Sequence, residues 1–219
     1  MSIQQLPRLS ARASLLLAPL LWLASAPLAT GATADGDAAS VAEIARHPDR
    51  YYLFTLLTLV GTMLLVPAVG GLAGLARTRS PLASFVGGGL VQLGVLIGVA
   101  DSGTQFLSWQ TAGGDPAQMA SLLHRYETAT GASVVFMVGG LSLIAGSLLF
   151  AFALRRARVA PLWAAACLPL AMVANIAGFA AGSRTLLAAS AAIMLAGFAR
   201  VALGPIRAAD RVESQLSLS

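Results

Sequence analysis

Few side chains in this 219-residue chain could do chemistry, and most of those are uncharged polar groups inside long apolar runs. Three threonines are spaced three and four residues apart, which places them on one face of a helix. Two amides and one carboxylate interrupt or follow neighbouring apolar runs, and another amide comes four residues after the carboxylate. The candidate site residues are Thr55, Thr58, Thr62, Gln92, Asp101, Gln105 and Asn175.

This set of polar residues has two interpretations. An aspartate at the centre of a membrane helix costs about 2.5–3.5 kcal/mol on insertion scales, so we expect such groups to point inward and find partners. They could form a polar pocket or pathway that opens to the outer side, with Asp101 at its mouth. They could instead form hydrogen bonds that hold helices together, with Asp101 at the water interface. The sequence leaves both interpretations open.

Catalytic and metal chemistry find little support in the sequence. It contains no Gly-x-Ser-x-Gly, phosphate-binding glycine loop or His-Glu-x-x-His motif. A transmembrane haem would need histidines inside spanning helices, whereas His47 and His124 lie in polar segments. A metal site built from His47, Asp49, Asp101, His124 and Glu127 has no tight ligand spacing. Cys167 has no partner and is expected to pack inside its helix. We therefore predict no catalytic residue, metal or cofactor.

The composition indicates a membrane protein. The chain is 57% hydrophobic and 11% charged, whereas soluble domains are about 45–50% apolar and about 25% charged. This balance excludes a disordered chain and favours lipid as the solvent, and one cysteine excludes a disulfide scaffold. The net charge of +5 comes from arginines that do not alternate with aromatic residues, so we expect no nucleic-acid partner.

The apolar residues divide into six runs of membrane length. Since backbone groups in lipid must be hydrogen-bonded internally, these runs are expected to be helices. The sequence therefore predicts one all-α membrane domain, residues 1–219, with spans at 13–34, 51–76, 80–100, 128–154, 159–183 and 185–203.

The first run also resembles a signal peptide, because Arg8 and Arg12 precede an apolar stretch and a small-residue cleavage site at 32–34. Cleavage would leave five helices. The length of the uncharged run, which continues past Pro27, favours a retained helix.

The arginines predict the orientation. With a cytoplasmic N-terminus, ten arginines and two acids lie inside, against four arginines and seven acids outside. This bias follows the positive-inside rule, so we expect both termini in the cytoplasm. The long outer segments, 35–50 and 101–127, are the first places to look for function.

Two prolines in the outer segments predict helix starts. Pro48 follows a potential cap, His47, and is expected to open the second spanning helix. Pro116 follows Asp115 and is expected to open an amphipathic helix over about 116–127 that lies on the outer surface.

Short phrases along the chain carry a family resemblance: Ile44-Ala45-Arg46-His47-Pro48-Asp49-Arg50-Tyr51, Leu64-Leu65-Val66-Pro67, and Arg156-Ala157-Arg158-Val159-Ala160-Pro161-Leu162-Trp163. The layout resembles uncharacterised six-helix integral membrane proteins of actinobacterial type. The resemblance covers nearly the whole chain and implies a plasma-membrane protein with a retained first helix, but it supplies no reaction.

Three functions stay open at this point. The first is a non-enzymatic membrane protein that binds or senses a small molecule from the outer face, or serves in a membrane complex. A small-molecule permease is the alternative, although the inner half of the bundle looks too apolar for an obvious path. A membrane-embedded enzyme is the third. Apart from the lipid bilayer and a possible small-molecule ligand, the sequence indicates no partner, and it does not determine the oligomeric state.

Overall fold

A computed structural model describes residues 6–30, 34, 36–111 and 113–203, and within these ranges every regular element is a helix. The elements are α1 (Leu6–Ser25), the 3-10 turn η1 (Ala26–Leu28), α2 (Asp37–Arg46), α3 (Pro48–Ala76), α4 (Pro81–Thr111), α5 (Pro116–Glu127), α6 (Thr130–Arg156), α7 (Leu162–Ala180) and α8 (Arg184–Ala202). Six segments, in α1 with η1, α3, α4, α6, α7 and α8, are long and apolar enough to cross a membrane. The prediction of an all-α bundle with six spanning helices is confirmed.

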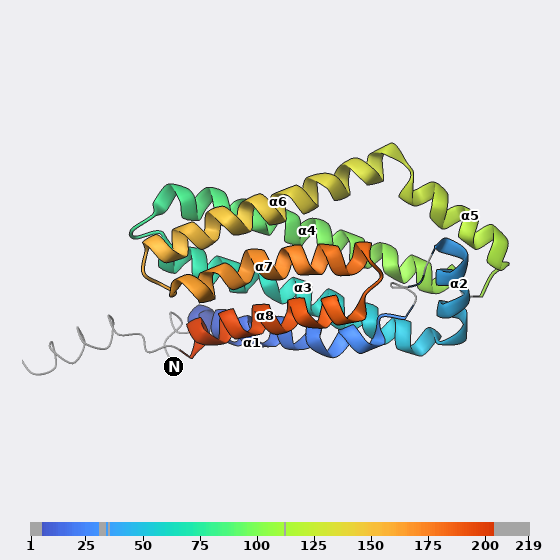
Figure 1. Ribbon diagram of the computed structural model, residues 1–219, viewed down its shortest axis with the longest axis horizontal. Coiled ribbons are helices and arrows are strands. Elements are labelled where there is room, and N and C mark those ends of the chain that lie inside the picture. The colour runs from blue at the N-terminus through green and yellow to red at the C-terminus, as the bar shows by residue number, and fades with distance from the viewer. Residues whose placement is uncertain (1–5, 31–33, 35, 112, 204–219) are drawn as a thin grey trace, which may run out of the picture.

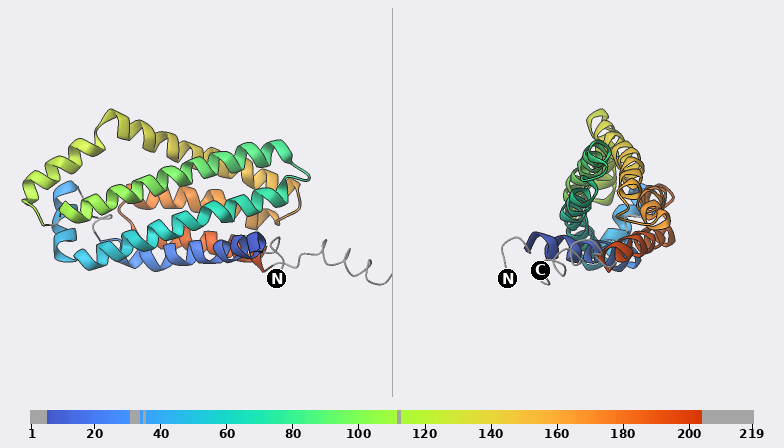
Figure 2. Two further views of the ribbon diagram at one scale, coloured as in Figure 1. Left: turned by 180° about the vertical axis from the view of Figure 1, so that it is seen from behind. Right: turned by 90° about the vertical axis from the view of Figure 1, so that its left-hand side faces the viewer.

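The six long helices form a closed ring in the order α1, α3, α4, α6, α7, α8 and back to α1. Figure 1 shows them running side by side, and the end-on view of Figure 2 shows them around a common axis. The first and last helices of the ring, α1 and α8, pack against each other and close it. The side-chain core fills the half of the ring that holds Leu72, Phe150, Met194 and Phe198.

The two ends of the bundle differ. At one end, here called the turn end, short turns at 77–80 and 157–161 join α3 to α4 and α6 to α7. At the other, here called the α2–α5 end, the two short helices pack on each other. His124 Nδ1 of α5 lies 3.1 Å from Asp37 Oδ2 of α2, which links them.

The predicted helix starts at the α2–α5 end are partly confirmed. Pro48 opens α3, but the His47 side chain makes no capping hydrogen bond. Asp115 caps α5 as expected, because its Oδ1 accepts a hydrogen bond of 2.9 Å from the Ala117 backbone nitrogen. The predicted amphipathic helix at 116–127 is present as α5.

Three predicted boundaries need correction. The third span does not end at residue 100, because α4 continues to Thr111 and carries Asp101 and Gln105 within the helix. The first helix does not continue past Pro27 but ends at Ser25, where η1 takes over. The outer segment 35–50 is not all loop, since α2 occupies Asp37–Arg46. At Asp101, hydrogen bonds from Thr104 and Gln105 of the same helix satisfy the carboxylate, so the charge does not end α4.

Glycines bring α4 and α6 into close contact over the turn-end half of the bundle. A Cβ on Gly87 would lie 2.7 Å from the Phe150 backbone nitrogen, and one on Gly146 would lie 2.7 Å from that of Val91. A Cβ on Gly139 would lie 2.8 Å from Ile97 Cγ2. Beyond Gly139 the two helices diverge toward the α2–α5 end, where α5 bridges them (Figure 1, Figure 2). On the next turns of α4, a Cβ on Gly103 would meet no atom within 4 Å.

Some predictions fall on residues that the structure does not describe. They are the cytoplasmic C-terminal segment, 204–219, and most of the cleavage site at 32–34.

Candidate ligand cavity

A cavity of about 570 Å³ lies inside the ring, toward the α2–α5 end. All six spanning helices and α5 contribute residues to its wall. Leu65, Val95 and Met172 line the cavity and also belong to the packed core, so they form its floor on the side of the turn end. The volume falls within the usual range for pockets that hold small organic molecules, about 300–1,000 Å³.

One face of α4 supplies a polar stripe to this cavity. Asp101, Thr104, Gln105 and Ser108 all line it. Their spacing of three, four and seven residues from Asp101 is that of one helix face. The stripe begins one turn beyond Ile97, where α6 leaves α4. The divergence of the two helices is therefore what makes room for polar side chains at this level.

Asp101 receives hydrogen bonds from its own helix. Gln105 Nε2 donates to Asp101 Oδ2 at 3.1 Å, and Thr104 Oγ1 lies 3.5 Å from Asp101 Oδ1. Thr104 Oγ1 also donates to the Asp101 backbone oxygen at 2.7 Å. Because an ionised carboxylate only accepts, the amide of Gln105 must present its nitrogen to Asp101. The Gln105 Oε1 atom is then left buried, with no hydrogen-bond partner among the described residues.

A second polar group joins α1 to α3 at the cavity wall. The Trp22 indole nitrogen donates to Thr62 Oγ1 at 3.2 Å, and Thr62 Oγ1 donates to the Thr58 backbone oxygen at 2.7 Å. The Thr58 hydroxyl is buried and has no partner within the described part of the chain. The cavity wall thus holds two buried oxygens, Thr58 Oγ1 and Gln105 Oε1, whose hydrogen-bonding capacity is unused.

The structure brings five of the seven candidate residues to this cavity. They are Thr58, Thr62, Asp101, Gln105 and Asn175. Thr55 is fully buried in α3 and does not line it. Gln92 lies elsewhere on α4 and donates from Nε2 to the Val66 backbone oxygen of α3 at 3.4 Å. Gln92 thus links two helices, as the structural interpretation describes for such residues.

Several cavity residues were missed by the sequence reasoning. Trp22, Thr104 and Ser108 supply polar atoms, and aromatic side chains come from five different helices: Trp22, Phe54, Tyr126, Phe136 and Phe179. The polar residues at 101, 104, 105 and 108 could have been recognised from the sequence. Their helical spacing indicates that the helix continues beyond Asp101 with one polar face. The aromatic residues carried none, since apolar side chains on membrane helices give no sign of which face turns inward.

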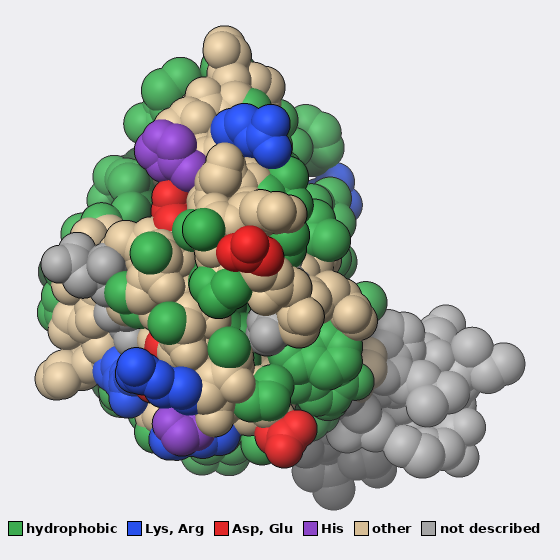
Figure 3. Space-filling view, turned by 90° about the vertical axis from the view of Figure 1, so that its right-hand side faces the viewer, with side chains coloured by type: hydrophobic (Ala, Val, Ile, Leu, Met, Phe, Trp, Pro, Cys, Tyr) green, Lys and Arg blue, Asp and Glu red, His purple; other side chains and the backbone are tan. Residues whose placement is uncertain are grey.

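Charged side chains cover the α2–α5 end outside the cavity. Figure 3 shows basic, acidic and histidine side chains scattered over this face. Its ion pairs join Glu43 to Arg46 at 3.6 Å and Asp37 to His124 at 3.1 Å. In the described ranges, no three side chains of His, Cys, Asp or Glu gather closely enough to hold a metal ion.

Comparison with family models, curated proteins and solved structures gives no match for this chain. The resemblance to six-helix actinobacterial membrane proteins therefore stays a prediction.

Proposed function

We propose that the protein is a non-enzymatic plasma-membrane protein that binds a small molecule in the ring cavity, from the outer side of the membrane. The observation that carries this proposal is the cavity itself, which joins a polar stripe to a pocket of ligand size. Membrane helices rarely keep an aspartate without a functional or structural need. Here Asp101 lines an open volume in place of a helix interface.

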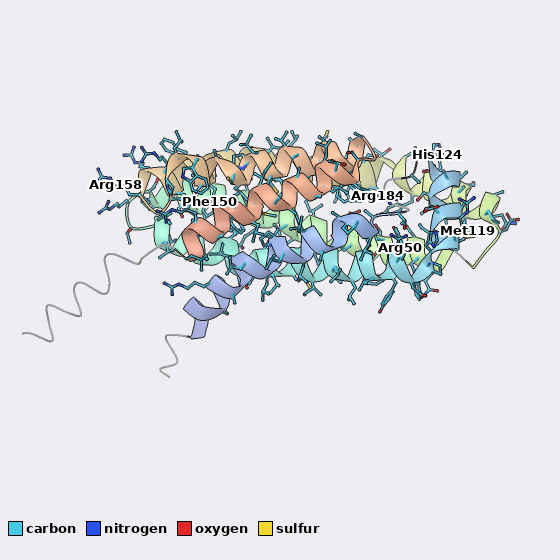
Figure 4. The ribbon with its side chains drawn as sticks, turned by 60° about the horizontal axis from the view of Figure 1, so that its bottom comes forward. Arg50, Met119, His124, Phe150, Arg158 and Arg184 are labelled. Atoms are coloured by element: carbon cyan, nitrogen blue, oxygen red, sulfur yellow. The ribbon has the colours of Figure 1, made fainter. Side chains whose placement is uncertain are left out.

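The distribution of arginine supports the orientation. Within the described residues the turn end carries eight arginines and no acid, namely Arg8, Arg12, Arg77, Arg79, Arg155, Arg156, Arg158 and Arg200. The α2–α5 end carries four, namely Arg46, Arg50, Arg125 and Arg184, together with acidic residues. Figure 4 shows Arg158 at one end and Arg50 and Arg184 toward the other. By the positive-inside rule, this asymmetry supports a cytoplasmic turn end.

The packing below the cavity favours binding over transport. Leu65, Val95 and Met172 close its floor, and the core continues from them toward the turn end. The polar side chains in that half, such as Ser84, Gln92 and Ser147, are uncharged and donate to backbone oxygens of the helices, so they hold the packing together and do not line an open path. A permease needs a polar path on both sides of its binding site. In this protein the polar cavity lies only toward the α2–α5 end, and packed side chains fill the bundle toward the turn end.

Thiol labelling tests both the access and the orientation. In a Cys167→Ala background, Ser108→Cys puts a thiol on the cavity wall and Ser190→Cys puts one at a fully buried serine outside it. In spheroplasts, the membrane-impermeant reagent trimethylammonium-ethyl methanethiosulfonate is expected to modify the first and not the second.

Arg158→Cys, at the turn end, serves as the orientation control and is expected to react only after permeabilisation. Equal slow labelling at positions 108 and 190 would contradict an accessible cavity. Labelling at position 158 in intact spheroplasts would contradict the orientation.

A further inference from the structure

Among the described residues, the cavity wall holds one carboxylate and no basic side chain. Asp101 is the only acidic residue of this part of the chain that lines the cavity, and none of the described lining residues is arginine, lysine or histidine. The ion pairs of the described residues lie at the outer surface of α2 and α5, and neither includes Asp101. An ionised carboxylate away from bulk water is costly unless it is paired with a cation. Hydrogen bonds from Gln105 and Thr104 hold the Asp101 carboxylate in place but leave its charge uncompensated.

Two residues of the cavity wall hold buried oxygens that have no hydrogen-bond partner among the described residues. Gln105 Oε1 is an acceptor only, and the Thr58 hydroxyl can accept as well as donate. With the Asp101 carboxylate, they make the wall on α3 and α4 rich in acceptor oxygens. A ligand that carries positive charge or N–H donors complements this set, whereas an anion would meet like charge.

The rest of the wall suits an apolar body. Most of the cavity surface is apolar, and an aromatic side chain comes from each of five helices: Trp22, Phe54, Tyr126, Phe136 and Phe179. Phe179 and Tyr126 line the cavity and each keep 38% of their surface exposed. Aromatic faces attract organic cations, most strongly after desolvation. A hydrated metal ion would find few oxygen ligands on such a wall to replace its water molecules.

We propose that the cavity takes a lipophilic organic monocation, an amine or a quaternary onium, with its charge near Asp101 and its apolar groups against the aromatic wall. This inference rests on the proposed function, since it names the chemical class of the ligand of the same cavity. Two observations carry it together: a carboxylate with no basic side chain among the described wall residues, and an aromatic wall around it.

The test uses two probes of the same shape and opposite charge. Tetraphenylphosphonium and tetraphenylborate are titrated by calorimetry into the full-length protein in lipid nanodiscs, with empty nanodiscs subtracted. The phosphonium is expected to bind saturably, about tenfold or more tightly than the borate, since the one ionisable carboxyl group among the described wall residues attracts cations when it is charged. Because this comparison needs no variant, it is independent of any folding defect.

Variants then assign the charge to Asp101. Asp101→Asn is nearly isosteric and is expected to weaken phosphonium binding by about tenfold or more, whereas Asp101→Glu retains most of it. Asp49→Asn is the matched control, because Asp49 is an exposed acid in the first turn of α3 that does not line the cavity. It should change binding by no more than about twofold.

The outcomes separate this inference from the proposed function. Gly140 lines the cavity, and the nearest atom to a Cβ there is Ile176 Cδ1 at 4.0 Å, so Gly140→Leu adds a side chain that narrows the cavity. If both probes bind equally and Gly140→Leu weakens both, the cavity binds small molecules but the cation class is wrong. Unchanged phosphonium binding in Asp101→Asn overturns the inference likewise. If neither probe binds, or Gly140→Leu has no effect on either, the proposed function fails as well.

Discussion

Gln105 orients the carboxylate of Asp101 one helical turn before it: its Nε2 donates to Asp101 Oδ2 at 3.1 Å, while its Oε1 stays buried and without a partner among the described residues. This pair explains how α4 carries an acid inside a membrane-length helix. The carboxylate is held by its own helix and turns toward a cavity instead of toward lipid.

The first prediction concerns that pair. Gln105→Met is expected to lower the free energy of unfolding by about 1.5–3 kcal/mol, because a hydrogen bond to a charged group is lost. In an Asp101→Ala background the same change should cost much less. Unfolding in mixed micelles, analysed as a double-mutant cycle, measures the coupling. Gln110→Met, at an exposed position near the end of α4, is the control and should be close to neutral. Full additivity of the two changes would contradict the pairing.

The contact between α1 and α3 gives the second prediction. Trp22→Phe removes the indole donor to Thr62 and should destabilise the protein by about 0.5–1.5 kcal/mol beyond the loss of apolar area. Trp163→Phe, at a residue that is 54% exposed in α7, is the matched control and should have little effect. Thermal unfolding in detergent compares the two. Equal melting temperatures for both variants would show that the Trp22 contact contributes nothing.

A third prediction tests the close approach of α4 and α6. Gly146→Ala places a Cβ 2.7 Å from the Val91 backbone nitrogen, which cannot move aside, and should cost about 1–3 kcal/mol. Gly89→Ala meets no atom within 4 Å on an exposed face of α4 and should be neutral, or stabilising by up to about 1 kcal/mol. Both are read from unfolding in mixed micelles. A reversed order of the two stabilities would be incompatible with the described packing.

The fourth prediction is that α1 stays in the mature protein. It fills the place between α3 and α8 in the ring, and Trp22 lines the cavity. Loss of α1 would open the ring and uncover buried residues of α3 such as Leu65 and Ala68. Intact-mass measurement of protein purified from membranes is expected to include residues 6–30. A mature chain that starts near residue 35 would refute this.

The spanning helices could be predicted because their signal is one of length: six apolar runs are long enough and interrupted seldom enough to be recognised. The end of α4 could not be predicted from the sequence, because a charged residue such as Asp101 usually marks the end of a spanning helix. In the structure, hydrogen bonds from Gln105 and Thr104 stabilise Asp101 within the helix. The helix α2 was missed because its ten residues are too polar and short to stand out.

The candidate site residues were also predicted only in part. Thr58, Thr62 and Asn175 were identifiable as polar residues in apolar runs, and they reach one cavity. Thr55 and Gln92 satisfied the same rule but do not line it, because the rule does not specify which way a helix face turns. That information comes from tertiary packing, here from the divergence of α4 and α6 beyond Gly139.

The central claim is that a small molecule enters the cavity beside the α4 polar stripe, and thiol protection tests it most directly. The labelling rate of the Ser108→Cys thiol in a Cys167→Ala background is measured with and without saturating tetraphenylphosphonium, and Arg158→Cys in permeabilised membranes is the control. We expect the probe to slow labelling at position 108 by about tenfold or more and to leave position 158 unchanged, because an occupied cavity excludes the reagent. An unchanged rate at position 108 would contradict it.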